Sequence, residues 1–136
     1  MAETLRLEIV TPQAIVFAED VDMVTFPGSE GQMGVYPQHV PLIAMLIPGE
    51  IIVNRNGVET FLAVGEGVVE VTAERVTIAT DMAIPSDKID EAKVEEARQR
   101  AEARLREKLS DEEVASVNAS LVRSVAQLQV RRRRRV

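Results

Sequence analysis

Glycine and proline are confined to the first two thirds of this 136-residue chain. All seven glycines lie between Gly28 and Gly67, and all six prolines lie between Pro12 and Pro85. Because Gly and Pro mark turns and end helices, a long stretch without them favours continuous helix. The sequence therefore predicts two architectures, a turn-rich domain at residues 1–85 and a helical domain at residues 86–136.

The first domain shows the alternation of apolar and polar residues that is typical of half-buried strands. The pattern runs through residues 5–10, 21–26, 68–72 and 76–80. Asn56-Gly57 separates two further apolar runs and predicts a two-residue hairpin turn, because both residues tolerate positive φ. Many short strands without an intervening helical period predict an antiparallel β-sandwich.

The second domain shows helical spacing of its apolar residues. Ser86 is the expected cap of a first helix that begins at Asp87, and Ser110 with Glu113 forms a capping box for a second helix. One face of the first helix would carry Ile89, Ala92, Ala97, Ala101, Leu105 and Leu109, and one face of the second Val114, Val117, Leu121, Val125 and Leu128. A short connection between two helices of similar length predicts a C-terminal α-helical hairpin.

This hairpin is expected to have low net stability. The first helix contributes mostly Ala, and each large aliphatic residue contributes only ~1.5–3 kcal/mol when fully buried. Ordering the backbone costs ~1–2 kcal/mol per residue. We therefore expect a hairpin that opens readily, and the alternative is a permanently folded hairpin that only pads the sandwich.

The composition excludes several classes of function. Without cysteine the chain has no disulfides and no thiolate chemistry, and with His39 as its one histidine it has no metal-ligand pattern. No phosphate-binding loop or nucleophile elbow occurs, so we expect no catalytic residues, no metal site and no enzyme activity. The N-terminus lacks the basic start and apolar run of a signal peptide, so we expect the mature chain to begin there, and the longest apolar stretch, residues 40–47, is too short to span a membrane.

Charge is distributed unevenly along the chain. Residues 1–87 hold three basic and thirteen acidic residues, whereas residues 88–136 hold thirteen basic and nine acidic ones. Five of the thirteen basic residues form the arginine run 131–135. The arginine run leaves a nucleic-acid binder open as a rival function, although the acidic first domain would repel a polyanion. A freestanding adaptor, with a sandwich that binds small molecules or peptides, is the other rival.

One long motif identifies a family. Residues 28–42 read G-S-E-G-x-x-G-x-x-P-x-H-x-P-L, and they are accompanied by residues 7–12, 47–49 and 89–92. Together these segments resemble the epsilon subunits of rotary, proton-translocating F-type ATP synthases, and the resemblance covers nearly the whole chain. The absence of a transit peptide points to a bacterial version.

The resemblance implies a noncatalytic subunit of the central rotor stalk. Its sandwich would bind the gamma subunit and the ring of c subunits, with Gly28, Ser29, Glu30, Gln32 and His39 as contact residues. Gln32 stands where many relatives carry an acidic residue, so an ion pair there becomes at most a neutral hydrogen bond.

The hairpin would regulate the enzyme. In the family it switches to an extended form that inserts among the alpha and beta subunits and inhibits ATP hydrolysis. Arg123 and the arginine run 131–135, which begins with Arg131, Arg132 and Arg133, are the candidates for that contact, and the alternative for the run is a disordered solubilising end. The complex would place the chain at the cytoplasmic face of the inner membrane, with no membrane contact except through its partners and no nucleic acid.

The resemblance also implies a candidate site for a weakly bound regulatory ATP. The family's signature for ATP is matched by Ile89 and Asp90, while Lys93 replaces an arginine, and Arg100 and Arg123 align with later arginines. Lys does not reproduce a planar bidentate phosphate contact. We therefore expect no tight ATP binding and no other cofactor.

Overall fold

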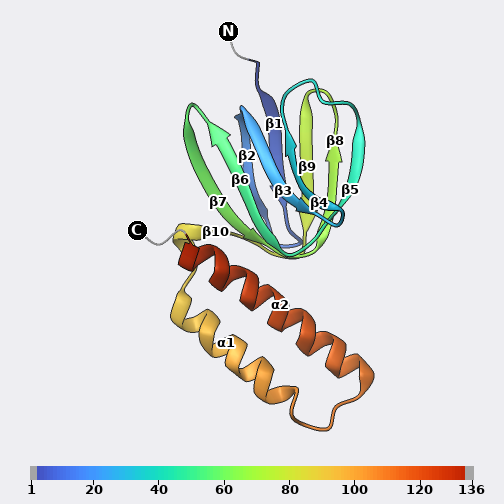
Figure 1. Ribbon diagram of the computed structural model, residues 1–136, viewed down its shortest axis with the longest axis vertical. Coiled ribbons are helices and arrows are strands. Elements are labelled where there is room, and N and C mark those ends of the chain that lie inside the picture. Colours follow the sequence, from blue (N-terminus) through green and yellow to red (C-terminus); the bar gives the residue numbers. More distant parts are fainter. Residues whose placement is uncertain (1–2, 134–136) are drawn as a thin grey trace.

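Ten strands and two α-helices make up residues 3–133, the part of the chain that the computed structural model describes (Figure 1). The strands are β1 (Leu5–Val10), β2 (Ile15–Val21), β3 (Met23–Gly28), β4 (Gly31–Val35), β5 (Leu42–Leu46), β6 (Gly49–Arg55), β7 (Val58–Val64), β8 (Gly67–Val71), β9 (Arg75–Thr80) and β10 (Ala83–Pro85). A short 3-10 helix, η1 (Ser86–Lys88), then leads to α1 (Glu91–Arg104) and α2 (Asp111–Arg133). The predicted order of a β-sandwich followed by a helical hairpin is confirmed.

The strands form two layers that are joined at one residue pair. One layer has the order β10-β7-β6-β3 with β4 beside β3, and the other has the order β5-β8-β9-β1-β2. The layers meet where Gly28 of β3 pairs with Leu46 of β5. All strand pairs are antiparallel except β1 and β9, which run parallel from Arg6 opposite Arg75 to Val10 opposite Ala79. The antiparallel character of the predicted sandwich is confirmed, and this one pair departs from it because period-two alternation is the same in parallel and antiparallel strands.

The core lies between the layers and is almost entirely aliphatic. In β1 the inward residues Leu5, Leu7 and Ile9 are buried, while the residues between them are partly exposed. Phe26 of β3 is the largest fully buried side chain of the described residues. The pattern at residues 21–26 spans two strands, because the chain turns at Asp22 and Val21 belongs to β2.

The Asn56-Gly57 turn has the predicted geometry. Asn56 has φ of 52° and Gly57 has φ of 78°, and Arg55 pairs with Val58 across the turn. We predict that Gly57→Ala lowers the free energy of unfolding of the sandwich by about 1–2 kcal/mol, because a Cβ at positive φ meets the neighbouring carbonyl. Denaturant titration measures it, with Glu59→Ala on the same hairpin as the control. Equal midpoints for the two variants would contradict the prediction.

The first helix begins later and ends earlier than predicted. Ser86 opens η1, and the cap of α1 is Asp90, whose Oδ1 accepts a hydrogen bond from the backbone N–H of Lys93 at 3.2 Å. Between them Ile89 is extended and buried, so the chain changes direction there before a helix forms. Leu105 caps the end of α1, and Leu109 lies in the connection to α2.

The second helix begins as predicted. The Ser110 hydroxyl accepts from the Glu113 backbone N–H at 3.2 Å, while the Glu113 carboxylate accepts from the Ser110 backbone N–H at 3.3 Å. This backbone hydrogen bond from Ser110 is the largest cause that lowers the pKa of Glu113. The two helices differ in length, with 14 residues in α1 and 23 in α2, so the expectation of similar lengths is wrong.

The hairpin is attached to the sandwich through the C-terminal half of α2. Val130 packs with Ile89 and with Ala63 of β7, and this cluster is called the joint below. Partly buried residues around it are Phe61, Met82, Ile84 and Val94. The predicted apolar stripe of α2 is buried only toward its end, since Leu128 is 3% exposed whereas Val114 is 36% exposed. The first half of α2 therefore lies largely outside the apolar contact.

Candidate interaction surfaces

The turn between β3 and β4 presents polar groups at one end of the sandwich. This end, which holds residues 28–31, is called the base below. Gly28 pairs with Gly31, which has φ of 125°, and a Cβ on Gly28 would lie 2.9 Å from the Gly31 carbonyl oxygen. The Ser29 backbone N–H donates to the Met45 carbonyl at 3.0 Å and fixes the turn to β5. Ser29, Glu30 and Gln32 are exposed. Four of the five predicted contact residues therefore share one tight turn.

His39 lies apart from that turn. It belongs to the loop between β4 and β5, whereas the turn precedes β4 and lies beside the end of β5. Five residues of extended strand separate the two ends by roughly 15–20 Å. The ring is half-buried, and its Nδ1 lies 2.7 Å from the Val40 carbonyl oxygen. The structure thus places the five predicted contact residues at two opposite ends of the sandwich.

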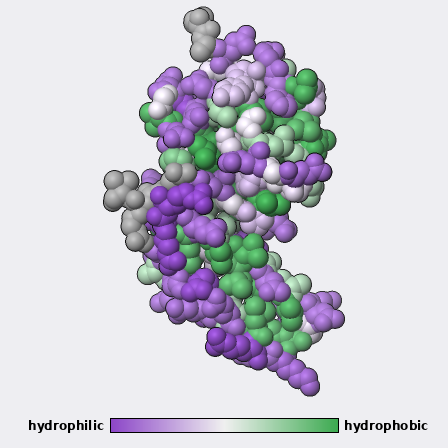
Figure 2. All heavy atoms as spheres, in the orientation of Figure 1, coloured by the Kyte–Doolittle hydropathy of each residue, from purple (hydrophilic) through white to green (hydrophobic). Residues whose placement is uncertain are grey.

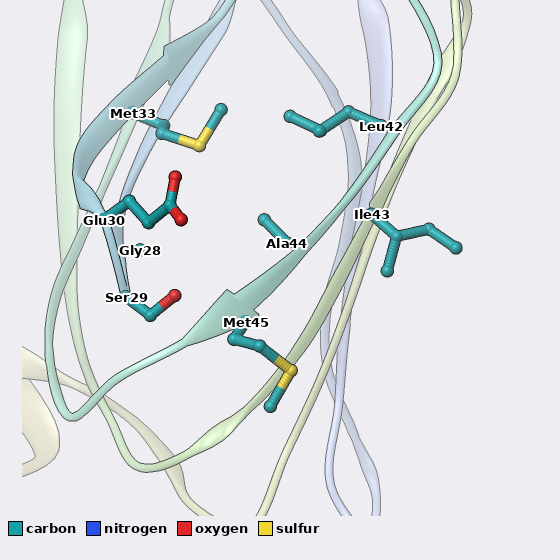
Figure 3. Close-up of a pocket in the computed structure, with 8 residues that line it drawn as sticks. All are labelled: Gly28, Ser29, Glu30, Met33, Leu42, Ile43, Ala44 and Met45. Atoms are coloured by element: carbon teal, nitrogen blue, oxygen red, sulfur yellow. The ribbon is translucent and has the colours of Figure 1, made fainter.

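Strand β5 presents apolar side chains on both of its faces. Figure 3 shows Leu42 and Ala44 directed toward Met33 and Glu30 across a pocket of about 350 Å³, whereas Ile43 and Met45 point away from it.

On that outer face Ile43 is 71% exposed and Met45 is 58% exposed, and Met45 lies directly opposite Val68 of β8, which is 41% exposed. We call Ile43, Met45 and Val68 the outer β5–β8 patch. Figure 2 shows apolar residues gathered on the side of the sandwich where these strands lie. Neighbouring exposed apolar residues of this kind mark interaction sites.

The sequence analysis did not predict this patch, because the segment that carries it lacks the alternation of apolar and polar residues that marks a half-buried strand. Residues 42–46 are all apolar, which is typical of a strand covered on both faces. In the isolated chain only the inner face is covered. The uninterrupted apolar run was therefore the available sign that something else covers the outer face.

The arginines of α2 are paired within the chain. Arg123 lies 3.4 Å from Asp81 in the turn before β10, and its other guanidinium nitrogen donates to Ser120 at 3.2 Å. Arg132 reaches Glu91 at 2.8 Å and Glu95 at 3.1 Å on α1. The predicted contact residues of the hairpin thus face its own folded neighbours, while residues 134–135 of the run lie outside the described part.

The two remaining arginines of the described run reach other elements. Arg131 donates to the Ser86 carbonyl at 3.4 Å, and Arg133 lies 3.4 Å from Glu50 of β6. The Glu50 side chain is only 8% exposed, so this carboxylate lies largely out of solvent. Sequence reasoning missed Glu50, because nothing in its local pattern distinguishes it from the other acidic residues of the sandwich.

Glu95 lies at the centre of the charges on α1. Hydrogen bonding from Arg98 is the largest cause that lowers the pKa of Glu95, and the charges of Arg98 and Arg132 act in the same direction. A carboxylate with a lowered pKa in the folded state stabilises that state above its ordinary pKa and loses this contribution as the pH falls. Acid therefore weakens first the pair of Glu95 with Arg98 within α1, and to a smaller extent the contact of Glu95 with Arg132 of α2.

The candidate ATP residues make different contacts within the closed hairpin. Ile89 is buried in the joint, Asp90 caps α1 and Arg123 faces Asp81. Lys93 and Arg100 are exposed. The pocket between the helices that Arg100 lines is formed otherwise by Ala97, Ala101, Arg104, Ser116, Val117 and Ser120.

Two negative findings concern the described residues alone. Within residues 3–133, no three His, Asp or Glu side chains come close enough to hold a metal ion. Neither described helix combines the length and the apolar composition needed to cross a bilayer.

Comparison with known proteins identifies both halves of the chain. Residues 4–86 match the family model for the ATP synthase delta/epsilon chain β-sandwich domain, and residues 87–131 match the model for its long α-helix domain. The ATP synthase epsilon chain of Herpetosiphon aurantiacus is 43% identical over 131 residues, which cover 96% of each chain. ATP synthase epsilon chain 2 of Syntrophotalea carbinolica is 44% identical over 131 residues, covering 96% of this chain and 95% of that one.

Solved structures share the fold at lower identity. A chain of the Euglena gracilis mitochondrial ATP synthase, in a structure of OSCP, F1 and the c-ring, aligns with a TM-score of 0.72 and 24% identity over 88% of this chain and 76% of that chain. A chain from the central stalk and c-ring of the Tetrahymena thermophila mitochondrial enzyme aligns with a TM-score of 0.64 and 13% identity over 93% of this chain and 96% of that chain. With two family models and full-length bacterial relatives in agreement, the chain belongs to the delta/epsilon family of ATP synthase subunits, among the bacterial epsilon chains.

Proposed function

We propose that this chain is a noncatalytic rotor subunit that couples proton-driven rotation to ATP synthesis and restrains ATP hydrolysis through its hairpin. Its partners would be the gamma subunit, the c-ring and the alpha and beta subunits, at the cytoplasmic face of a bacterial inner membrane. The chain would reach the membrane only through these partners.

The sandwich offers two separate contact surfaces for this role. The rigid turn with Ser29, Glu30 and Gln32 supplies polar groups for the polar loops of a c-ring. The outer β5–β8 patch and the loop with His39 supply an apolar surface along the side of the sandwich, which suits the gamma subunit. Both structural neighbours come from ATP synthase structures that include a c-ring, and the Tetrahymena thermophila chain comes from a structure of the central stalk and c-ring, which is consistent with a rotor role.

The observation that carries the inhibitory role is the small size of the joint. Its buried centre consists of Ala63, Ile89 and Val130. Burial of one Val and one Ile, with little from Ala, stabilises the closed hairpin by on the order of 5 kcal/mol. A restraint of this size is within reach of contacts with other subunits, because a ligand shifts an equilibrium by its differential affinity for the two states.

Removal of residues 87–136 tests the proposal. We predict that ATP synthase assembled with the truncated chain hydrolyses ATP several-fold faster, while assembly and proton pumping are retained, because the sandwich keeps both of its contact surfaces. Hydrolysis rates and proton pumping in membrane vesicles measure the two effects. Unchanged hydrolysis would remove the inhibitory role, and loss of assembly would remove the division of labour between the domains.

Regulation by ATP remains a secondary proposal. Arg123 is paired to Asp81 in the closed hairpin, and Lys93 does not reproduce a planar bidentate phosphate contact. We expect at most weak binding, and calorimetric titration of the isolated chain with ATP tests it. Micromolar affinity would contradict this expectation.

A further inference from the structure

The end of α2 touches three other elements of the chain through three consecutive arginines. Arg131 reaches the Ser86 carbonyl of η1, Arg132 bridges Glu91 and Glu95 of α1, and Arg133 reaches Glu50 of β6. A helix places consecutive residues about 100° apart around its axis, so three neighbours point in three directions. The run is therefore arranged to meet a different partner at each position.

These contacts surround the buried centre of the joint. Val130, which is 2% exposed, directly precedes the run and packs on Ile89 and Ala63. Opening of the hairpin therefore separates the apolar contact and the ionic contacts together. Attraction of cations to the helix C-terminus would explain basic residues at the end of α2, but it does not require acidic partners on two other elements.

We propose that Arg131, Arg132 and Arg133 form a latch that holds the hairpin closed, with Glu50, Glu91 and Glu95 as its receiving residues. Arg132 is the central member, because it contacts two carboxylates whose side chains are only 28% and 25% exposed. Arg133 ties the same helix end to the sandwich through the largely buried Glu50.

The latch gives the arginine run two uses that exclude each other. In the closed form the guanidinium groups of Arg131, Arg132 and Arg133 are occupied within the chain, and in the open form they are free for acidic residues of another subunit. The second use rests on the proposed function. The latch itself concerns the isolated chain. A failure of the latch therefore does not overturn the proposed contact with another subunit, and a failure of that contact does not overturn the latch.

The distance between two labels on the isolated full chain tests the latch. Because the chain has no cysteine, Ser29→Cys and Asn118→Cys give unique positions, one at the base of the sandwich and one on the exposed half of α2. Single-molecule energy transfer then counts closed and open molecules. Exposed ion pairs each shift such an equilibrium by about two- to fivefold, so Arg132→Glu should raise the open-to-closed ratio by about tenfold.

Three further variants make the result decisive. Glu91→Arg combined with Arg132→Glu should return the ratio to within about threefold of the original chain, since the swap restores an ion pair of reversed polarity. Glu50→Gln should raise the ratio by about two- to fivefold through a different element. Arg55→Glu is the matched control, because Arg55 pairs with Glu19 at 2.9 Å within the sandwich and should leave the ratio unchanged.

Two outcomes would overturn the latch. One is an Arg132→Glu ratio equal to that of Arg55→Glu. The other is a swapped double variant that stays as open as the single variant. The denaturation midpoint of the sandwich, measured on the same samples, should shift by no more than the loss of one exposed ion pair in any variant, and it separates an opened hairpin from an unfolded chain.

Discussion

Replacement of Phe26 by Ala is expected to lower the free energy of unfolding of the sandwich by about 3–5 kcal/mol. Phe26 is fully buried between the two layers, and it lies in β3, the strand through which the layers are joined. The core has no other aromatic side chain of this burial within the described residues, since Phe17 and Phe61 are only partly buried. The surrounding Val, Leu and Ile residues would have to collapse into the space left behind.

Urea denaturation followed by circular dichroism measures this effect, and Phe61→Ala is the matched control. Phe61 lies at the edge of the joint and is partly exposed, so its replacement should cost the sandwich clearly less. A loss at Phe26 no larger than the loss at Phe61 would contradict the assignment of Phe26 as the centre of the core. Most single substitutions cost 0.5–3 kcal/mol, so a value above that range is diagnostic of a buried core position.

Replacement of Val130 by Asp is expected to release the hairpin while the sandwich stays folded. The change removes about 1.5–3 kcal/mol of apolar burial and places a carboxylate where it would have to lose its water. Because burial at the joint is small, the cheaper response is for α2 to leave the sandwich. Amide hydrogen exchange should then accelerate through the C-terminal half of α2. A loss of about 2.7 kcal/mol of stabilisation corresponds to a hundredfold acceleration, because each factor of ten is about 1.36 kcal/mol.

Val114→Asp provides the control on the same helix. Val114 is 36% exposed and lies in the half of α2 outside the joint, so the same chemical change should leave exchange near residue 130 unaltered. Exchange in β7 and β9 should also be unaltered by Val130→Asp. Equal acceleration in the sandwich and in α2 would show that the two domains unfold as one unit, and the proposed opening of the hairpin would then be wrong.

The strands and turns of the sandwich were largely predictable because their signals are local. Alternation at residues 5–10 and the Asn56-Gly57 pair depend only on neighbours in the chain, and both were confirmed. The capping box at Ser110 and Glu113 is local in the same way. The predicted start of α1 at Asp87 was wrong. Burial of Ile89 against Ala63, which is distant in the sequence, decides the path of the chain there.

The interaction surfaces were less predictable, for a related reason. The predicted contact residues follow one continuous motif, but β4 carries the chain from one end of the sandwich to the other between Glu30 and His39. The outer β5–β8 patch depends on which face of β5 is left uncovered, which only the pairing with β8 and the position of the core determine. The pairing of Arg133 with Glu50 joins residues 83 positions apart, a distance that no local pattern encodes.

The parallel pairing of β1 with β9 constrains how this chain folds during translation. Arg6 pairs with Arg75, and Val10 pairs with Ala79. During translation the edge of β1 that pairs with β9 therefore stays unpaired until almost the whole sheet has left the ribosome. Distant pairings of this kind slow folding and leave edges vulnerable to wrong partners in the meantime. The strand that closes this edge, β9, leaves the ribosome before α1 and α2, so every residue of the β1–β9 pairing is available before the helical segment has emerged.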